Sequence, residues 1–213
     1  IDGGSTDKSL KIIKKYEKKI DYWVSEKDNG IYDAFNKGMI VSKGEFIGFI
    51  NSDDIYKKDA LSIISNYIRK NKATDFIFGS VKKHWGILHG YKPHKIKYSW
   101  GFYSSHSTGF FIKRKAAEKV GFYNIKYKYH ADYDYFYRLI VKNKMKGIST
   151  KKKEVVGIFR RGGFSSKISF WKKLKEDIRI RYDNGQNIFL LILIFSNKFL
   201  RNIDEILKNI IKK

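Results

Sequence analysis

The sequence predicts an α/β fold with a mostly parallel sheet flanked by helices. Helical and strand-like patterns alternate along most of the 213 residues, which favours right-handed connections between parallel strands. The run EFIGFI at residues 45–50 is apolar on both faces, as a strand covered by helices on each side requires. A chain of this length, 42% hydrophobic, is expected to enclose one sizeable core.

The individual elements follow from periodicity and from turn residues. The first helix is expected to have its N-cap at Ser5 or Thr6, and Gly44 is expected to end the second helix. The expected helices are residues 5–20, 30–44, 57–71, 114–120 and 131–144. The expected strands are residues 21–25, 45–50 and 107–113, with two further strands joined by a turn in residues 74–92.

The chain is strongly basic. It has 45 Lys and Arg against 21 Asp and Glu, a net charge of +24, and a pI near 9.9. This charge predicts an anionic partner, whether nucleic acid, a lipid surface or a phosphorylated ligand, although an AT-rich coding sequence would also favour Lys, Ile and Asn. The absence of Cys excludes disulfides and thiolate metal sites.

The C-terminal residues 167–213 are predicted to form a basic, amphipathic helical extension. Phe170, Trp171, Leu174 and Ile178 fall near one another on a helix, with Lys and Arg around them. The apolar run at residues 188–195 is too short to span a bilayer. The extension is therefore expected either to lie on anionic lipid or to cap the sheet.

Polar residues stop the apolar strand abruptly at Asn51-Ser52-Asp53-Asp54. Ligands of open α/β sheets bind beyond the carboxyl ends of strands. Two neighbouring carboxylates raise each other's pKa unless a cation compensates them, and a divalent metal carrying a diphosphate would do so. The alternative is that Asp53 or Asp54 caps the helix that begins near Lys57.

Five motifs then occur in order along the chain: IDGGSTDKS (1–9), SEKDNGIYDAFNKG (25–38), GEFIGFINSDD (44–54), HSTGFFIKRKAAEKVGFYN (106–124) and ADYDYFYRL (131–139). Together they resemble the family 2 glycosyltransferases, inverting enzymes with the Rossmann-like GT-A fold, in particular those of bacterial surface-polysaccharide synthesis such as capsule and lipopolysaccharide. The resemblance covers residues 1–166 as one domain. It implies that the chain lacks the first strand and helix of that domain.

The resemblance implies a set of nucleotide-sugar contacts. Those in the first two motifs fall on Asp2, Ser5, Asp28, Gly30 and Asn36. The late segment GIFRRGGFSS resembles a loop near the diphosphate, where arginine side chains and glycine amides hold phosphate oxygens. In this chain those residues are Arg160, Arg161, Gly162 and Gly163.

The family's Asp-x-Asp metal motif maps onto the strand end, with Asp53 as its last acid and Asp54 in support. Its first acid is Asn51 here, which can still ligate a metal or contact the nucleotide-sugar through its carbonyl oxygen but brings no charge. The expected cofactor is Mn²⁺ or Mg²⁺.

The catalytic base of the family corresponds to Asp132, with Ala131 in place of the usual Glu. The alternative is that Asp132 is only a helix N-terminal residue, and that Asp134 pairs with Arg138 one turn later. The resemblance places His106 near the acceptor, whereas His130 is as readily a loop residue as a participant.

The resemblance thus implies metal-dependent, inverting transfer of a sugar, with UDP as the expected nucleotide, to a saccharide or lipid-linked acceptor. The expected location is cytoplasmic, peripheral on the inner face of the plasma membrane. The competing hypothesis is a non-catalytic, degenerate transferase that binds anionic membrane or nucleic acid. Nucleic acid is disfavoured because the scarce acidic residues gather at strand and helix ends, where a phosphate-binding face should avoid them.

Overall fold

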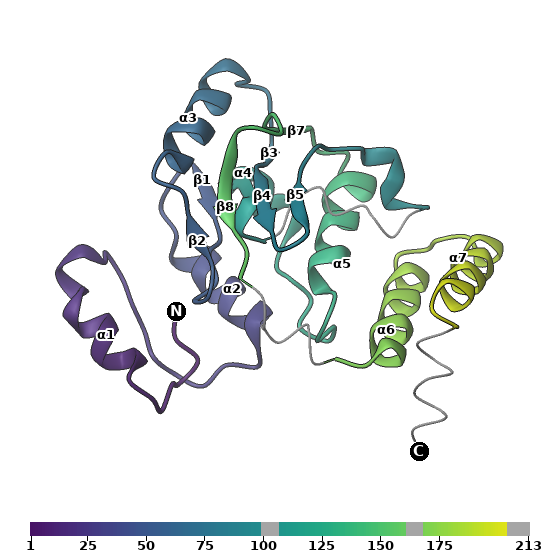
Figure 1. The fold of residues 1–213 in the computed structure, drawn as a ribbon, viewed down its shortest axis with the longest axis horizontal. Coiled ribbons are helices and arrows are strands. Elements are labelled where there is room, and N and C mark those ends of the chain that lie inside the picture. The colour runs from purple at the N-terminus through teal and green to yellow at the C-terminus, as the bar shows by residue number, and fades with distance from the viewer. Residues whose placement is uncertain (99–106, 161–167, 204–213) are drawn as a thin grey trace.

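The computed structural model describes residues 1–98, 107–160 and 168–203, and its strands form two four-stranded sheets (Figure 1). The first sheet has the order β1-β6-β3-β7. Its strands are β1 (Phe46–Gly48), β6 (Phe110–Lys113), β3 (Phe76–Phe78) and β7 (Gly147–Ser149). The second sheet has the order β2-β8-β4-β5. Its strands are β2 (Ile55–Tyr56), β8 (Val155–Ile158), β4 (Ser80–Lys83) and β5 (Gly86–Leu88).

Both sheets are mixed, so the prediction of a mostly parallel sheet is wrong. Among the described strands, only β3 with β7 and β4 with β8 pair in parallel, and the other neighbours are antiparallel. Apolar periodicity identifies strands but does not encode their direction. The connection from β4 to β5 contains only His84 and Trp85, and so short a turn requires an antiparallel pair.

The five bounded helices that the sequence predicts occur in order, four of them with shifted ends, and the predicted C-terminal helical extension forms two helices within the described residues. They are α1 (Ser9–Lys15), α2 (Ile31–Val41), α3 (Ala60–Lys70), α4 (Arg114–Val120), α5 (Ala131–Tyr137), α6 (Phe170–Asp183) and α7 (Ile188–Arg201). Short 3-10 turns occupy Glu17–Lys19, Pro93–Ile96 and Ser107–Gly109. A π-helical turn, Arg138–Lys142, continues α5.

Several local predictions are corrected. The N-cap position of α1 is Lys8, not Ser5 or Thr6, because the Ser5 hydroxyl donates to Asp2 instead. Residues 21–25 form no strand beyond a single parallel bridge between Asp2 and Ser25. Residues 74–92 hold three strands rather than two, and α2 ends before Gly44.

The larger core cluster is rich in aromatic residues, and part of it lies between the first sheet and α5. Phe78 and Phe110, on adjacent strands, both pack edge-on against Phe136 of α5, and the Phe110 and Phe136 ring centres are 4.8 Å apart. All three side chains are buried. A smaller core lies on the side of α3, where Ile64 packs with Phe111 and other apolar residues. The first sheet is therefore covered on both faces, as its continuous apolar strands require.

Helices α6 and α7 form a hairpin beside α5, at the opposite side of the molecule from α1 (Figure 1). A buried cluster joins the two helices: Asp177 accepts hydrogen bonds from Arg181, at 3.1 Å, and from Lys198 of α7. Arg181 also stacks over the ring of Tyr133, 4.6 Å from its centre. Within the described ranges, no helix combines the length and hydropathy needed to cross a membrane.

Candidate active site

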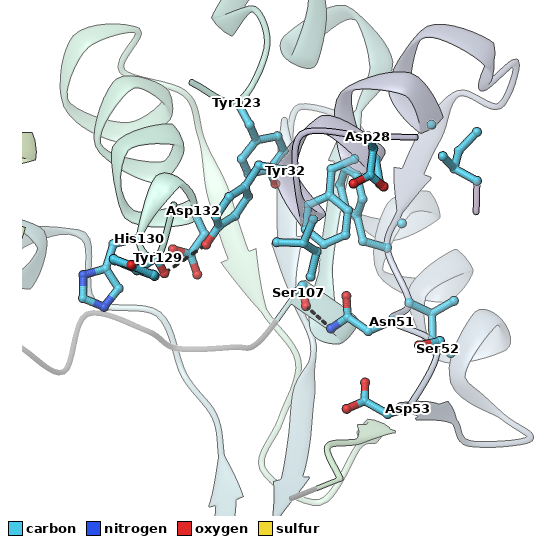
Figure 2. Close-up of a pocket in the computed structure, with 18 of the residues that line it drawn as sticks. Asp28, Tyr32, Asn51, Ser52, Asp53, Ser107, Tyr123, Tyr129, His130 and Asp132 are labelled. Atoms are coloured by element: carbon cyan, nitrogen blue, oxygen red, sulfur yellow. Dashed lines mark hydrogen bonds between the residues drawn. The ribbon is translucent and has the colours of Figure 1, made fainter. Parts of the chain in front are cut away.

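A cleft of about 910 Å³ opens at the carboxyl end of β1. Its walls come from α2, from the segment after β1, from the end of β4 and from the loop that enters α5. Figure 2 shows Asp132, Tyr129 and His130 on one side, with Asn51, Ser52 and Asp53 on the other. Residues far apart in sequence therefore face one space, at the position expected for a ligand in an α/β sheet.

Asn51 lines this cleft. Its Nδ2 donates to Asp54 Oδ2 and to Ser107 Oγ, each at 3.0 Å. Its Oδ1 is buried and, among the described residues, has no hydrogen-bond partner. A buried acceptor without a donor is unfavourable by about 1–3 kcal/mol, so a ligand that supplies a donor or a cation would be stabilised there.

Asp53 and Asp54 point to different environments although they are adjacent. Asp53 is exposed and lines the cleft. Asp54 is buried, and its carboxylate accepts hydrogen bonds from the Thr108 hydroxyl and the Asn51 amide, with a longer one from the Arg160 backbone N–H at 3.3 Å. Neither residue caps α3, whose N-cap position is Asp59.

The described residues contain no group of three His, Cys, Asp or Glu side chains that could hold a metal ion. They do bring two residues with oxygen-bearing side chains to the same cleft: Asp53, which is exposed, and Asn51, whose Oδ1 is buried and has no hydrogen-bond partner among the described residues. Oxygen ligands of this kind suit Mg²⁺ or Mn²⁺, which commonly take their remaining ligands from substrate phosphates and water. The pair therefore fits a cation shared with a diphosphate.

Asp2 builds a tight loop and is not part of the cleft wall. Its carboxylate accepts hydrogen bonds from the backbone N–H groups of Gly4 and Ser5 and from the hydroxyls of Ser5 and Ser25, at 2.5–3.1 Å. These donors, the Ser5 hydroxyl foremost, lower the pKa of Asp2 to about 2. Ser5 is consequently held against Asp2.

Asp28 lies between this loop and the cleft. Its Oδ1 accepts a hydrogen bond from Gly30 N at 2.9 Å, and a side chain at Gly3 would collide with its carboxylate. Gly30 has φ of +107°, a backbone conformation that favours glycine, and α2 begins directly after it. Asp28 thus lines the cleft at the entrance of α2.

Asn36 faces away from the cleft lining. Its side-chain amide makes two hydrogen bonds to the backbone of Tyr123, with Nδ2 donating to the carbonyl at 2.9 Å and Oδ1 accepting from the N–H at 2.8 Å. The Tyr123 ring stacks on Tyr32 of α2. Asn36 therefore fixes α2 to the loop between α4 and α5.

Asp132 lies in the first turn of α5 and lines the cleft (Figure 2). Burial raises the pKa of Asp132, and the charge of His130 and the Tyr133 N–H, which donates to Oδ1 at 2.8 Å, offset part of that rise. A carboxylate with a raised pKa is a stronger base than an exposed aspartate. Neighbouring His130 also lines the cleft, and its Nδ1 is buried with no hydrogen-bond partner among the described residues.

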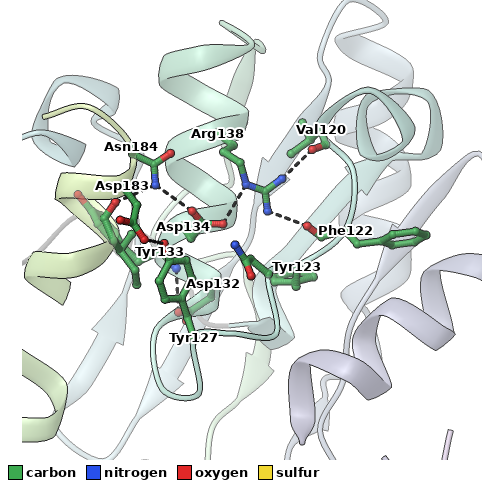
Figure 3. Close-up of polar contacts among 12 residues, drawn as sticks. Val120, Phe122, Tyr123, Tyr127, Asp132, Tyr133, Asp134, Arg138, Asp183 and Asn184 are labelled. Carbon is green, nitrogen blue, oxygen red and sulfur yellow. Dashed lines mark hydrogen bonds and ion pairs between the residues drawn. The ribbon is translucent and has the colours of Figure 1, made fainter. Parts of the chain in front are cut away.

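Asp134 is structural, as the alternative interpretation of this helix predicts. It pairs with Arg138 at 2.9 Å and accepts a hydrogen bond from Asn184 of the α6–α7 turn at 2.8 Å (Figure 3). Arg138 also donates to the carbonyl oxygens of Val120 and Phe122, each at 2.7 Å. The network ties α4, α5 and the end of α6 together behind Asp132.

Glu176 of α6 holds the loop that leads into α5, and the sequence analysis missed it. Its two carboxylate oxygens accept hydrogen bonds from three consecutive backbone N–H groups, those of Lys128, Tyr129 and His130, at 2.6–2.8 Å. The Tyr32 hydroxyl donates to the Tyr129 carbonyl at 3.2 Å from the other side. No sequence pattern could reveal this contact, because it joins residues that are 46 to 48 positions apart in the chain, with α5, β7 and β8 between them.

Lys83, at the end of β4, is a second residue that sequence reasoning missed. It lines the cleft with its ammonium group 4.7 Å from the centre of the Phe159 ring. Of the remaining predicted contacts, Arg160 is exposed and donates its backbone N–H to Asp54. His106, Arg161, Gly162 and Gly163 lie outside the described residues.

The sequence is similar to known glycosyltransferases. The model for "Glycosyl transferase family 2" matches residues 1–136. A "PGL/p-HBAD biosynthesis glycosyltransferase" of Mycobacterium tuberculosis is 27% identical over 144 residues, covering 63% of this chain and 54% of the relative. The chain thus spans about half the length of this curated relative.

Two solved structures share the fold. S. aureus TarS superposes with a TM-score of 0.68 at 17% identity, covering 93% of this chain and 37% of TarS, and a shorter form of it has been solved with UDP. A mannosyltransferase from Pyrobaculum calidifontis, solved with GDP-Man and Mn²⁺, superposes with a TM-score of 0.59 at 13% identity, covering 93% of this chain and 59% of the enzyme. Because the family model matches more than half of its residues, the chain belongs to glycosyl transferase family 2.

Proposed function

We propose that this protein transfers a sugar from a UDP-sugar to a hydroxyl of a saccharide or lipid-linked acceptor in cell-surface polysaccharide synthesis, with inversion at the anomeric carbon. The observation that carries the proposal is that Asp132 and the pair Asn51 and Asp53 line one cleft. A basic carboxylate and a set of oxygen ligands are what the acceptor and the diphosphate each require.

In this mechanism Asp132 accepts the proton of the acceptor hydroxyl while the hydroxyl oxygen attacks the anomeric carbon. The bond from that carbon to the diphosphate oxygen breaks in the same step, so the configuration inverts. Burial raises the pKa of Asp132 and makes it a stronger base. A divalent cation bound by Asp53 and Asn51 Oδ1 would neutralise charge on the departing diphosphate.

The choice of UDP is supported by the UDP complex of TarS, whereas the Pyrobaculum enzyme is described with GDP-Man. A panel of UDP- and GDP-sugars, offered with saccharide and lipid-linked acceptors, tests both the donor and the acceptor by release of the nucleoside diphosphate. Proton NMR of the product then reports the anomeric configuration. Retention of configuration, or binding of UDP without transfer from any donor, would contradict the proposal, and the latter result would support the non-catalytic alternative.

We infer that the α6–α7 hairpin brings the cleft to the inner face of an anionic membrane, where a lipid-linked acceptor would be reached. The outward face of α7 is apolar, with Phe189 73% and Leu193 67% exposed. Each acidic residue of the hairpin already has a protein partner: Glu176 binds backbone N–H groups, Asp177 pairs with Arg181, and Asp183 pairs with Lys126. The exposed charge that remains on the hairpin, from Lys172, Lys175 and Arg201, is positive, which complements anionic lipid.

Vesicle sedimentation tests this location. Leu193→Glu is expected to abolish sedimentation with vesicles containing phosphatidylglycerol, because it places a carboxylate in the apolar face. The matched control is Leu61→Glu on α3, since Leu61 is equally exposed at 65% but belongs to another surface. Equal binding by both variants and the unaltered chain would contradict membrane docking through α7.

A further inference from the structure

The end of β4 places one lysine beside the cleft and its neighbour away from it. Lys83 pairs with Gly86 in the β4–β5 hairpin, and Lys82 lies alongside Ile158 of β8. Successive residues of a strand point to opposite faces. Accordingly, Lys83 is half-buried and lines the cleft, whereas Lys82 is exposed.

Phe159 fixes the position of the Lys83 ammonium group. The Phe159 N–H donates to the carbonyl of Lys82 at 2.9 Å, so the residue that follows β8 is tied to β4. Its ring lies 4.7 Å from Lys83 Nζ. The ammonium group is thus held against an aromatic face, in an arrangement that attracts cations.

No carboxylate of the described residues lies within ion-pair distance of Lys83, whereas two other lysines that are not exposed, Lys37 and Lys198, have such partners. Lys37 pairs with Glu26 at 2.8 Å, and Lys198 pairs with Asp177 in the α6–α7 hairpin. Burial lowers the pKa of Lys83, while the more distant Asp54 and Asp132 favour its charged form. A sheltered cation without an ion-pair partner is unfavourable in the free protein, and an anionic ligand in the cleft would offset that cost.

We propose that Lys83 binds a phosphate oxygen of the donor's diphosphate. The inference rests on the proposed function and adds a residue to it. The Phe159 ring under Lys83 directly precedes Arg160, whose backbone N–H donates to the Asp54 carboxylate, and that carboxylate also holds Asn51. Lys83 therefore belongs to the diphosphate side of the cleft. Its positive charge would act on the diphosphate together with that of a cation, which Asp53 and the neutral Asn51 would hold with a single negative charge.

Binding of UDP and of uridine to four proteins tests this assignment. Calorimetry measures UDP affinity, and saturation-transfer NMR measures uridine binding, for the unaltered chain and for Lys83→Met, Lys83→Arg and Lys82→Met. Lys83→Met is expected to weaken UDP binding about 10- to 100-fold, the usual effect of losing a charged hydrogen bond, and to leave uridine binding unchanged. Lys83→Arg is expected to restore most of the UDP affinity, and Lys82→Met to alter neither ligand.

The outcomes separate this inference from the proposed function. If the unaltered chain binds UDP and Lys83→Met binds it equally well, the assignment of Lys83 is wrong and the nucleotide site stands. If Lys83→Met weakens UDP and uridine equally, or lowers the melting temperature by more than Lys82→Met does, Lys83 supports packing rather than phosphate. If the unaltered chain binds no UDP, both the assignment and the proposed nucleotide-sugar function fail.

Discussion

Aspartate is held in opposite ways at the N-terminal loop and at the start of α5. The Asp2 carboxylate accepts four hydrogen bonds, three from within its loop and one from Ser25, and its pKa falls to about 2. Asp132 lines the cleft in a sheltered position where burial raises its pKa. The first arrangement fixes a permanent anion that organises the backbone, and the second maintains a carboxylate able to take up a proton.

The largest expected effect is that of Asp132→Asn, which should lower activity and raise thermal stability. Asp132→Asn should reduce sugar transfer about 10²- to 10⁴-fold while UDP affinity stays unchanged. The same variant should melt at a higher temperature at pH 7. A pKa raised by folding means that the ionised form is penalised in the folded state, so the stability contributed by the protonated carboxyl is lost as pH rises.

Melting curves between pH 3 and pH 8 check the second half of this prediction. The stabilisation by Asp132→Asn should be greatest at neutral pH and should shrink as the solution approaches the ordinary aspartate pKa near 3.8. A variant that melts lower than the unaltered chain at pH 7 would show that the Asp132 charge is structural.

Asp53 and Asp54 are adjacent in the chain, but one is exposed and the other is buried, so their contributions to stability should differ. Asp54→Ala should lower the free energy of unfolding by about 2–4 kcal/mol, because it removes a buried acceptor used by Thr108, Asn51 and Arg160. Asp53→Ala should change it by less than about 0.5 kcal/mol, as expected for an exposed residue. Urea denaturation measures both, and equal losses would refute the division of roles.

Glu176 offers a smaller effect that acts through the loop before Asp132. Glu176→Gln replaces one acceptor oxygen by an NH₂ group that faces backbone donors, so the loop from Lys128 to His130 should loosen. We expect kcat to fall about tenfold with little change in the donor KM, since misplacing a catalytic group affects the transition state most. Glu118→Gln on α4, where the side chain is exposed, is the matched control; a donor KM effect alone would contradict a positioning role.

The smallest effect concerns Asp2. A lowered pKa stabilises the folded loop above the ordinary aspartate pKa of 3.8, and this contribution is lost as the pH falls toward 2. Asp2→Asn should therefore speed amide hydrogen exchange in residues 2–5 at neutral pH, and this effect should shrink as the pH falls toward 2. Unchanged exchange at neutral pH would show that the backbone alone maintains the loop.

The sequence alone predicted those features of the fold and the site that depend on residues close together in the chain. The apolar run ending at Asn51 located the carboxyl end of β1, and the Asp134–Arg138 pair was predictable from helix spacing. The sequence did not predict contacts between segments that are far apart in the chain. Nothing in the letters shows that Asp54 turns toward Thr108, that Glu176 binds the loop before α5, or that Phe159 holds Lys83 at the cleft. Strand direction was also mispredicted, because apolar patterns identify burial and not polarity.

The most direct test of the nucleotide-sugar site is calorimetric titration of UDP into the protein, with and without Mn²⁺, repeated for Asp53→Ala and Asp54→Asn. Our account predicts that UDP binding strengthens with Mn²⁺ and that Asp53→Ala abolishes this dependence. Asp54→Asn, measured well below its melting temperature, should retain the dependence, since Asp54 faces inward. Absence of UDP binding by the unaltered chain, or a metal dependence that survives Asp53→Ala, would contradict the account.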